Sequence, residues 1–143
     1  MQQTETIWMN GRLVAWGEAT VHVASHGLHY GSGVFEGIRA YETAGGSSIF
    51  RLTDHLRRLH DSARLLGMKL PYSVDELRSA AIELVAANGL AECYLRPIAF
   101  YGFGELGVGP VTEAIRDEYL RCVRGTSVYS PAWLEHVALE LAA

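Results

Sequence analysis

The feature of this 143-residue sequence that most limits its fold is a change of hydrophobic period near residue 53. Before that point, apolar and polar residues alternate in short segments bounded by glycine, which is the period of β-strands. After it, Leu56, Leu59, Ala63 and Leu66 recur three or four positions apart, the period of an amphipathic helix. We therefore expect an α+β fold, a small antiparallel sheet packed with two helices, followed by a C-terminal helical segment.

Turn sequences divide the first fifty residues into short strands. The pair Asn10–Gly11 supplies the positive backbone angles of a two-residue turn, so it predicts a β-hairpin between two apolar segments. Ala44–Gly46 predicts a second hairpin. Residues 19–25 predict a further short strand, and the glycine-rich residues 26–35 predict a loop or one loose helical turn.

Capping residues mark the two helices. Gly67 is placed to end the first helix. Ser73, with Glu76 three residues later, forms a capping box that predicts the start of the second, and Asn88–Gly89 predicts its end. Residues 92–102 return to strand character.

The composition bounds the partners of the chain. With 49% apolar and 20% charged residues, the sequence is of ordinary globular type and of a length that suits one core. The formal net charge of −4 predicts neither nucleic-acid nor membrane partners, because both need clustered Lys and Arg. The N-terminus has no basic flank with an apolar run, and Cys93 and Cys122 are widely separated. These features predict a cytoplasmic protein with reduced thiols.

Three histidines raise the hypothesis of a zinc site. His22, His26 and His29 are spaced as on one side of a helix. The strand-like run around His22 and the glycines behind it break that shared side. We therefore predict no metal site.

Strand alternation brings out two candidate binding groups. Tyr94 and Arg96 lie two positions apart, so both project from one side of a strand and offer a phenol beside a guanidinium, a combination suited to carboxylates. The same rule places Phe35, Gly37 and Arg39 on one side, where the glycine lets a ligand approach the backbone. An amphipathic strand with its polar ends in water and a strand bulge are the respective alternatives.

One arginine and one lysine complete the candidates. Arg58 lies beside the apolar stripe of the first helix, so its guanidinium can emerge between helix and sheet, where a phosphate is a natural partner. The alternative is an exposed arginine paired with Asp54 or Asp61 at turn spacing. Lys69 is the one lysine of the sequence, and we expect it on the surface.

Four segments, in order, closely resemble the N-terminal small domain of branched-chain amino acid aminotransferases, which are fold-type IV pyridoxal phosphate enzymes. They are IWMNG, VHVASHGLHYGSGVFEGIRAYE, FRLTDHLRRLHDSARLLGM and YLRPIAFYG with GVG after it, and the likeness covers about residues 5–109. It implies that Arg58 grips the cofactor phosphate. It also implies substrate-pocket roles for the following residues: Phe35, Gly37 and Arg39 as a wall, Tyr94 and Arg96 as carboxylate readers, and Tyr30 and Val108 as residues lent by the other subunit of a dimer.

The tail resembles a different part of the same family. GPVTEAIRDEYLRCVRG, with WLEHV after it, is similar to the C-terminal helix of full-length members. We therefore expect two portions, residues 1–109 and 110–143, that meet at a join at Gly109–Pro110. The resemblance implies that most of the large domain is missing, including the Schiff-base lysine and the glutamate that pairs with the cofactor ring. Lys69 does not match that lysine.

The resemblance implies an activity that the chain by itself is not expected to perform. Family members move an amino group between leucine, isoleucine or valine and 2-oxoglutarate with pyridoxal phosphate, and we expect this chain alone to be inactive without the lysine. The alternatives are a non-catalytic, dimerising small-domain module or a truncated gene product. Within the fold, the alternatives are a D-amino acid aminotransferase or an aminodeoxychorismate lyase. An open apolar side bearing Phe35 and Ile98 predicts homo-oligomers.

Overall fold

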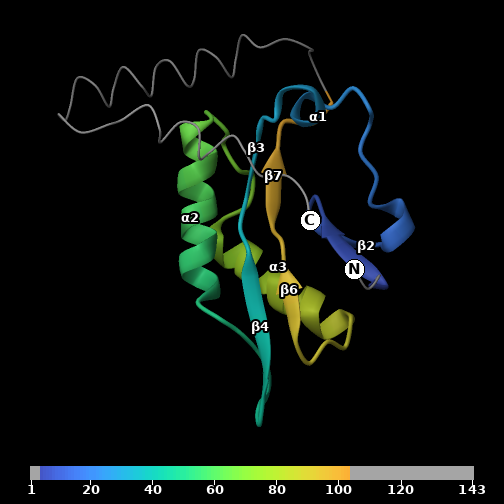
Figure 1. Ribbon diagram of the computed structural model, residues 1–143, viewed down its shortest axis with the longest axis vertical. Helices are drawn as coiled ribbons and strands as arrows, with labels where there is room; N and C mark the ends of the chain where they lie inside the picture. The colour runs from blue at the N-terminus through green and yellow to red at the C-terminus, as the bar shows by residue number, and fades with distance from the viewer. Residues whose placement is uncertain (1–3, 104–143) are drawn as a thin grey trace, which may run out of the picture. The chain divides into compact units, whose positions relative to one another are not determined.

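A computed structural model of the protein describes residues 4–103 (Figure 1). These residues divide between two compact units. Of the described residues, the first unit comprises 4–20, Glu36–Arg58 and Pro71–Pro97. The second comprises Val21–Phe35, Leu59–Leu70 and 98–103. Val108, the join and the predicted C-terminal helical segment lie outside the described residues.

The first unit opens with the predicted hairpin of β1 (Thr6–Met9) and β2 (Arg12–Ala15). Asn10 and Gly11 form its turn with φ of 50° and 91°, the left-handed conformation for which this pair is suited. A short 3₁₀ turn, η1 (Trp16–Glu18), follows. The first hairpin prediction is therefore confirmed.

A three-stranded antiparallel sheet forms the centre of the first unit. It has the order β5 (Gly46–Ile49), β4 (Ile38–Thr43), β6 (Cys93–Leu95), and Figure 1 shows β4 beside β6. The second predicted hairpin is confirmed, with Gly46 at φ 104° where β5 begins. Ile38 pairs with Leu95 and Arg39 with Tyr94, a register that decides which side chains are neighbours at the site.

The two predicted helices are present. α2 (Leu52–Leu65) runs through both units, and its apolar stripe of Leu56, Leu59 and Ala63 is buried. α3 (Val74–Ala87) begins with both bonds of the capping box, since the Ser73 hydroxyl accepts from the Glu76 backbone N–H and the Glu76 carboxylate accepts from the Ser73 N–H.

Positive φ angles at Gly67 (69°) and Gly89 (61°) follow the two helices as expected. Asn88 ends α3 and holds β1 through its side chain. Its Oδ1 accepts from the backbone N–H groups of Glu5 and Thr6, each at 3.0 Å. Within residues 4–103 no helix combines the length and the apolar character that crossing a bilayer requires.

The second unit contains α1 (His26–Tyr30) and an antiparallel pair, β3 (Gly33–Phe35) with β7 (Ile98–Phe100). The single helical turn expected in residues 26–35 is thus α1. Residues 19–25 form no strand, so that prediction is wrong. Val21 and Val23 are exposed. The alternation of apolar and polar residues suited a β-strand, but a strand also needs a neighbouring strand to pair with, and alternation does not show whether one is present.

Both long strands expected from the sequence are interrupted. Residues 92–102 divide at Arg96–Pro97 into β6 and β7, because proline has no N–H to donate to a sheet. The segment 35–43 divides at Glu36–Gly37 into β3 and β4. The Glu36 N–H donates to the Pro97 carbonyl at 3.0 Å, which ties the two interruptions together.

Candidate functional site

Burial alternates along the chain through the interruption between β3 and β4. Val34, Glu36, Ile38 and Ala40 are buried, whereas Gly37 is half-buried and Arg39 exposed. The alternation on which the sequence prediction depended therefore persists where the strand hydrogen bonding does not. It separates a buried side, which contains one acidic residue, from an open side.

The open side of β4 and β6 brings together four of the predicted binding residues. Tyr94 lies opposite Arg39 in the strand register. Arg96 follows β6, and its Nη2 donates to the Tyr94 hydroxyl at 3.4 Å while its guanidinium lies 5.3 Å from the Tyr94 ring centroid. A Cβ added at Gly37 would overlap the Tyr94 hydroxyl, so the phenol occupies the space that this glycine leaves.

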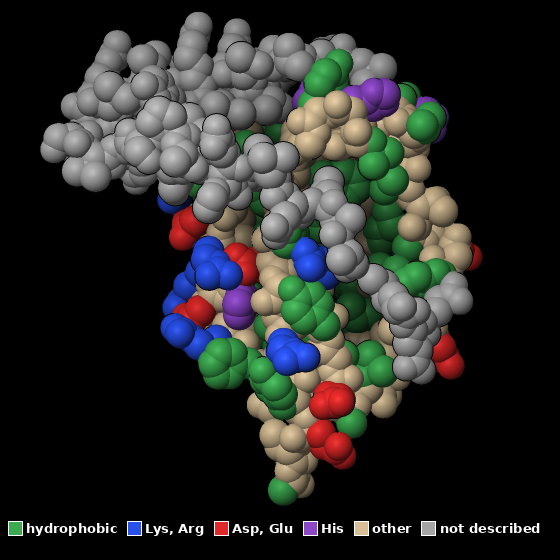
Figure 2. Space-filling view, in the orientation of Figure 1, with side chains coloured by type: hydrophobic (Ala, Val, Ile, Leu, Met, Phe, Trp, Pro, Cys, Tyr) green, Lys and Arg blue, Asp and Glu red, His purple; other side chains and the backbone are tan. Residues whose placement is uncertain are grey.

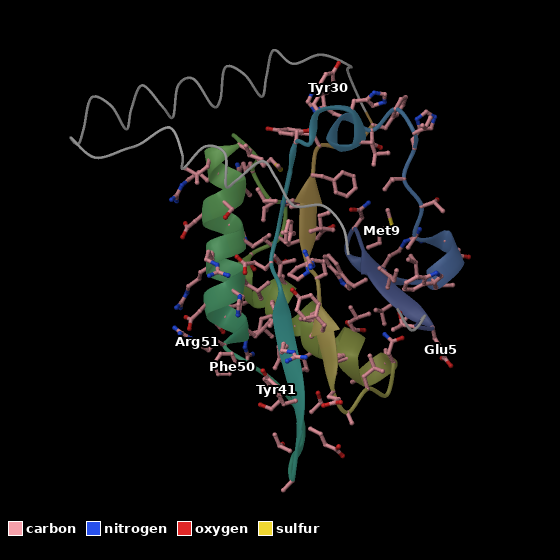
Figure 3. The ribbon with its side chains drawn as sticks, in the orientation of Figure 1. Glu5, Met9, Tyr30, Tyr41, Phe50 and Arg51 are labelled. Carbon is pink, nitrogen blue, oxygen red and sulfur yellow. The ribbon has the colours of Figure 1, made fainter. Side chains whose placement is uncertain are left out.

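Chemically, this open side offers two guanidinium groups over aromatic rings. The Arg39 guanidinium lies 5.9 Å from the ring centroid of Tyr41, a neighbour that the sequence analysis did not single out. Figure 3 labels Tyr41 on β4, and Figure 2 shows basic side chains beside hydrophobic ones over this sheet. Planar guanidinium forks and phenolic hydroxyls are donors that match carboxylate oxygens. The predicted proximity of Tyr94 and Arg96 is confirmed, while their role remains a prediction.

Phe35 and Tyr30 belong to the second unit. Phe35 is half-buried and pairs with Ile98, which is 43% exposed, as expected for an open apolar side. Tyr30, labelled at α1 in Figure 3, is half exposed and stacks obliquely on the His26 ring at 4.5 Å between centroids. Pocket roles for Phe35 and Tyr30 stay predictions.

Arg58 emerges between α2 and the segment before β4, as the sequence analysis expected. Its Nε donates to Glu36 Oε1 at 2.7 Å and its Nη2 donates to Glu36 Oε2 at 2.6 Å. The alternative of pairing with Asp54 or Asp61 is wrong. Asp54 and Asp61 form ion pairs with other arginines: Arg51–Asp54, Arg57–Asp54 and Arg64–Asp61.

Glu36 is the buried acidic residue of the alternation. Its side chain is 5% exposed, and His55 Nδ1 lies 2.9 Å from Oε2. Burial raises the pKa of this carboxyl, but the hydrogen bonds and charge of Arg58 and His55 outweigh burial and bring the pKa below its usual value. Hydrogen bonding to Glu36 in turn raises the pKa of Arg58.

The described residues fit one part of pyridoxal phosphate and not another. Arg58 uses two of its five N–H donors on Glu36, and its Nη2 also lies 3.4 Å from His55 Nδ1. The remaining donors, at the outer edge of the guanidinium, suit a phosphate. The aldehyde of the cofactor has no counterpart, because Lys69 is the one lysine and is exposed in the segment after α2.

Burial raises the pKa of the Cys93 thiol, which lowers its thiolate fraction.

Sequence analysis missed Glu36 and His55. A usable signal was present, since Glu36 occupies a position where the alternation of Val34, Ile38 and Ala40 demands a buried side chain. A buried carboxylate needs a cationic partner, and Arg58 was already placed beside the apolar stripe of the facing helix.

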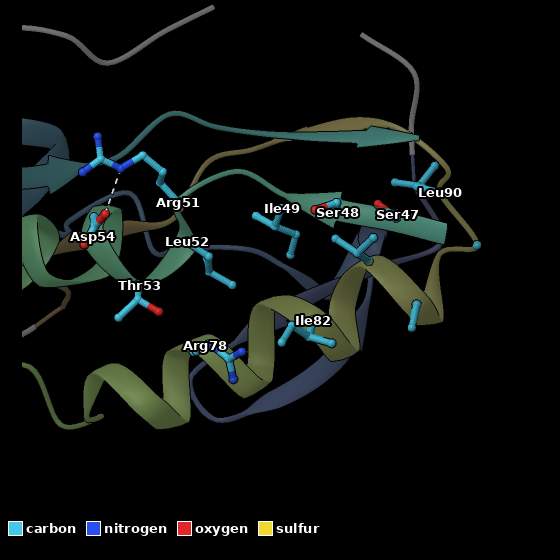
Figure 4. A pocket seen from close by; sticks show the side chains of 13 residues that line it. Ser47, Ser48, Ile49, Arg51, Leu52, Thr53, Asp54, Arg78, Ile82 and Leu90 are labelled. Atoms are coloured by element: carbon cyan, nitrogen blue, oxygen red, sulfur yellow. Dashed lines mark hydrogen bonds and ion pairs between the residues drawn. The ribbon is translucent and has the colours of Figure 1, made fainter. Parts of the chain in front are cut away.

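A separate open cavity of about 780 Å³ lies in the first unit, between β5, the start of α2, and α3 (Figure 4). Ile49, Leu52 and Ile82 contribute apolar surface, while Arg51 is tied to Asp54 at 2.8 Å. Its lining contains none of the predicted binding residues.

Comparison with known proteins decides the family. The profile described as Amino-transferase class IV matches residues 33–142. The chain belongs to the amino-transferase class IV family. It is 51% identical over 102 residues to the branched-chain-amino-acid aminotransferase of Pseudomonas aeruginosa, a match that covers 71% of this chain and 33% of the relative. The corresponding Escherichia coli K12 enzyme is 44% identical over 109 residues, which cover 76% of this chain and 35% of that one.

Solved structures of class IV aminotransferases have the same fold. The Escherichia coli branched-chain amino acid aminotransferase matches with a TM-score of 0.73 and 44% identity, over 74% of this chain and 35% of that one. A second such enzyme, complexed with N-(5'-phosphopyridoxyl)-L-glutamate, matches with a TM-score of 0.75 and 49% identity, over 78% and 38%. The α+β prediction is confirmed, and this chain spans about a third of the length of the curated relatives.

Proposed function

We propose that this class IV chain carries the carboxylate-reading part of a branched-chain aminotransferase site. In the complete site, an amino group would pass between leucine, isoleucine or valine and 2-oxoglutarate with pyridoxal phosphate. The arrangement of Arg96, Tyr94 and Gly37 carries this proposal, because it aligns a guanidinium with a phenol on an exposed strand. The relatives named above act on branched-chain amino acids according to their names, which supports the substrate class.

We propose further that the 143-residue chain by itself does not catalyse transfer. The reaction needs an amine that bonds to the cofactor and moves the substrate proton, and Lys69 is the one lysine. Purified chain added to pyridoxal phosphate and leucine should give the same visible spectrum as cofactor and leucine without protein, because the free aldehyde and the amino acid form a Schiff base by themselves. The full-length Escherichia coli relative serves as the positive control, and turnover by the 143-residue chain would reject this part.

Carboxylate binding can be tested without catalysis. We expect 2-oxoglutarate to perturb the NMR signals of the Arg39 and Arg96 side chains. Arg96→Met should weaken this binding, and Tyr94→Phe should weaken it less, because only one donor is lost. Arg12→Met removes an exposed arginine from β2 and is the matched control. Equal weakening by Arg12→Met and Arg96→Met would contradict the proposed site.

A second candidate is a non-catalytic module that associates with itself or with a complete subunit. The exposure of Ile98 and Tyr30 on the second unit favours it. Light scattering after size-exclusion chromatography should detect dimers, alone or with a full-length relative. A monomer at high concentration that ignores the relative would remove this candidate.

The join at Gly109–Pro110 is also a proposal. Its support is the match of the family profile to residues 33–142 of a chain that spans about a third of its relatives. Sequencing the encoding DNA across residues 105–115 would reject it if an intervening coding segment were found.

A further inference from the structure

Glu36 is placed as no ordinary strand residue would be. It is a carboxylate with 5% of its side chain exposed, between β3 and β4, and the neighbouring buried residues Val34, Ile38 and Ala40 are apolar. Both oxygens are engaged, Oε1 by Arg58 and Oε2 by Arg58 and His55, at 2.6–2.9 Å. Its backbone is fixed as well, by the bond of its N–H to Pro97.

The partner of Glu36 is open to solvent. The side chain of Arg58 is 67% exposed, yet its Nε and one Nη2 hydrogen face the buried carboxylate. A guanidinium is planar and has a second edge, formed by Nη1 and Nη2, that can bind two oxygens at once. When the first edge is fixed by Glu36, the direction of the second edge is fixed too.

We propose that Glu36, supported by His55, is a positioning residue that holds Arg58 so that its outer edge binds a phosphate group. This inference rests on the proposed function, whose cofactor carries a phosphate, and on the expectation from the family resemblance that Arg58 meets that phosphate. It goes beyond both because it assigns roles to Glu36 and His55, which contact Arg58 and each other. The ligand class is a phosphate monoester or inorganic phosphate, whose paired oxygens match the Nη1–Nη2 edge.

Two effects of Glu36 on anion binding oppose each other. Holding a flexible arginine in advance favours binding, because the entropy of ordering that side chain is lost during folding and not during binding. The negative charge of Glu36 disfavours every anion near Arg58. The second effect grows with the charge of the anion, so it differs between phosphate and chloride. A variant that keeps the charge of Glu36 but changes its reach separates the two effects.

The experiment uses the whole chain, isotopically labelled, with the Arg58 Nε–H signal observed by NMR. In the unchanged chain this N–H should exchange slowly with water, because it is bonded to a buried carboxylate, whereas that of Arg57 should exchange fast. Inorganic phosphate should shift the Arg58 signal more than an equal ionic strength of chloride does. Circular dichroism of each variant verifies folding.

Glu36→Gln should release the Arg58 signal to fast exchange. Glu42→Gln removes the same charge from an exposed position of β4 and should leave both readouts unchanged. Glu36→Asp keeps the charge but shortens the reach, so it should reduce the preference for phosphate over chloride by about 2- to 10-fold. This second variant tests the geometry if Glu36→Gln does not fold.

Two results would overturn the inference. One is an Arg58 N–H in the unchanged chain that exchanges as fast as that of Arg57. The other is an unchanged preference for phosphate in Glu36→Asp. Failure of the proposed function would appear differently, as a chain that ignores 2-oxoglutarate while its Arg58 signal remains protected and phosphate-sensitive.

Discussion

The segment from Glu36 through β4 holds arginine side chains differently on its two sides. On the buried side, Arg58 reaches a carboxylate whose side chain is 5% exposed and forms two hydrogen bonds with it. On the open side, the guanidinium groups of Arg39 and Arg96 lie over the rings of Tyr41 and Tyr94. Within the described residues, 4–103, the Arg39 guanidinium forms no ion pair.

The difference between the two settings indicates which arginines contribute to stability and which are available to a ligand. A guanidinium bound to an internal carboxylate is fixed in place, and breaking that pair leaves a buried charge. A guanidinium over an aromatic ring keeps its positive charge for a ligand, since the ring contributes only a weak attraction. We therefore expect the loss of Arg58 to lower stability in addition to weakening phosphate binding, whereas the loss of Arg39 should weaken ligand binding with little effect on stability.

The largest expected effect comes from removing Arg58. Arg58→Met leaves the Glu36 carboxylate buried with His55 as its remaining partner, and we expect a loss of about 3 kcal/mol in the free energy of unfolding. Arg39→Met is the matched control, because it removes an exposed arginine and should cost less than about 0.5 kcal/mol. Urea unfolding at pH 7 measures both. Equal losses would remove the distinction between the two sides.

Acid should weaken the same pair. The pKa of Glu36 is below its usual value, so its stabilising contribution is present above the pKa of the unfolded chain and is lost as the pH falls through the folded value. The groups that face it are Arg58 and His55. We expect the stability difference between the unchanged chain and Arg58→Met to shrink from pH 7 toward pH 3. A difference that stays constant would show that Glu36 is not the charged partner.

Local signals predicted much of this fold. The turn at Asn10–Gly11 and the capping box of Ser73 and Glu76 each depend on residues within one turn, and both are confirmed. The strand expected at residues 19–25 failed, because alternation reports which side chains suit a sheet and not whether a neighbouring strand is available.

The candidate site was predicted only in part, because only some of its contacts join residues that are close together in the sequence. Tyr94 and Arg96 are two positions apart, and their contact follows from strand geometry alone. Glu36 and Arg58 are 22 residues apart, and their contact depends on how α2 follows the sheet. The sequence analysis offered Arg58 only the nearby carboxylates Asp54 and Asp61, which it does not use.

A smaller effect is expected where Gly37 admits the Tyr94 hydroxyl. Gly37→Ala would place a methyl group where that hydroxyl lies, so the Tyr94 ring must swing away. Because Tyr94 is exposed, we expect a loss of only about 1 kcal/mol in unfolding free energy. The contact of Arg96 with the ring should disappear, which NMR shifts of both side chains would register. Gly17→Ala, with nothing within 4 Å of its added Cβ, is the control and should change neither.

The smallest effect is expected for the exposed pairs of α2, which complete the comparison with Arg58. Arg64 and Asp61 lie 3.2 Å apart with side chains 73% and 62% exposed, so water solvates both charges whether or not they pair. Arg64→Gln should lower the free energy of unfolding by less than about 0.5 kcal/mol, and that loss should vanish at high salt because mobile ions screen exposed charges. Urea unfolding at low and high ionic strength measures both quantities. The Arg58 and Glu36 pair should keep most of its contribution at the same salt concentration, since its carboxylate is out of reach of mobile ions. A loss for Arg64→Gln that equals the loss for Arg58→Met at either ionic strength would mean that the burial of Glu36 does not set the strength of its pair.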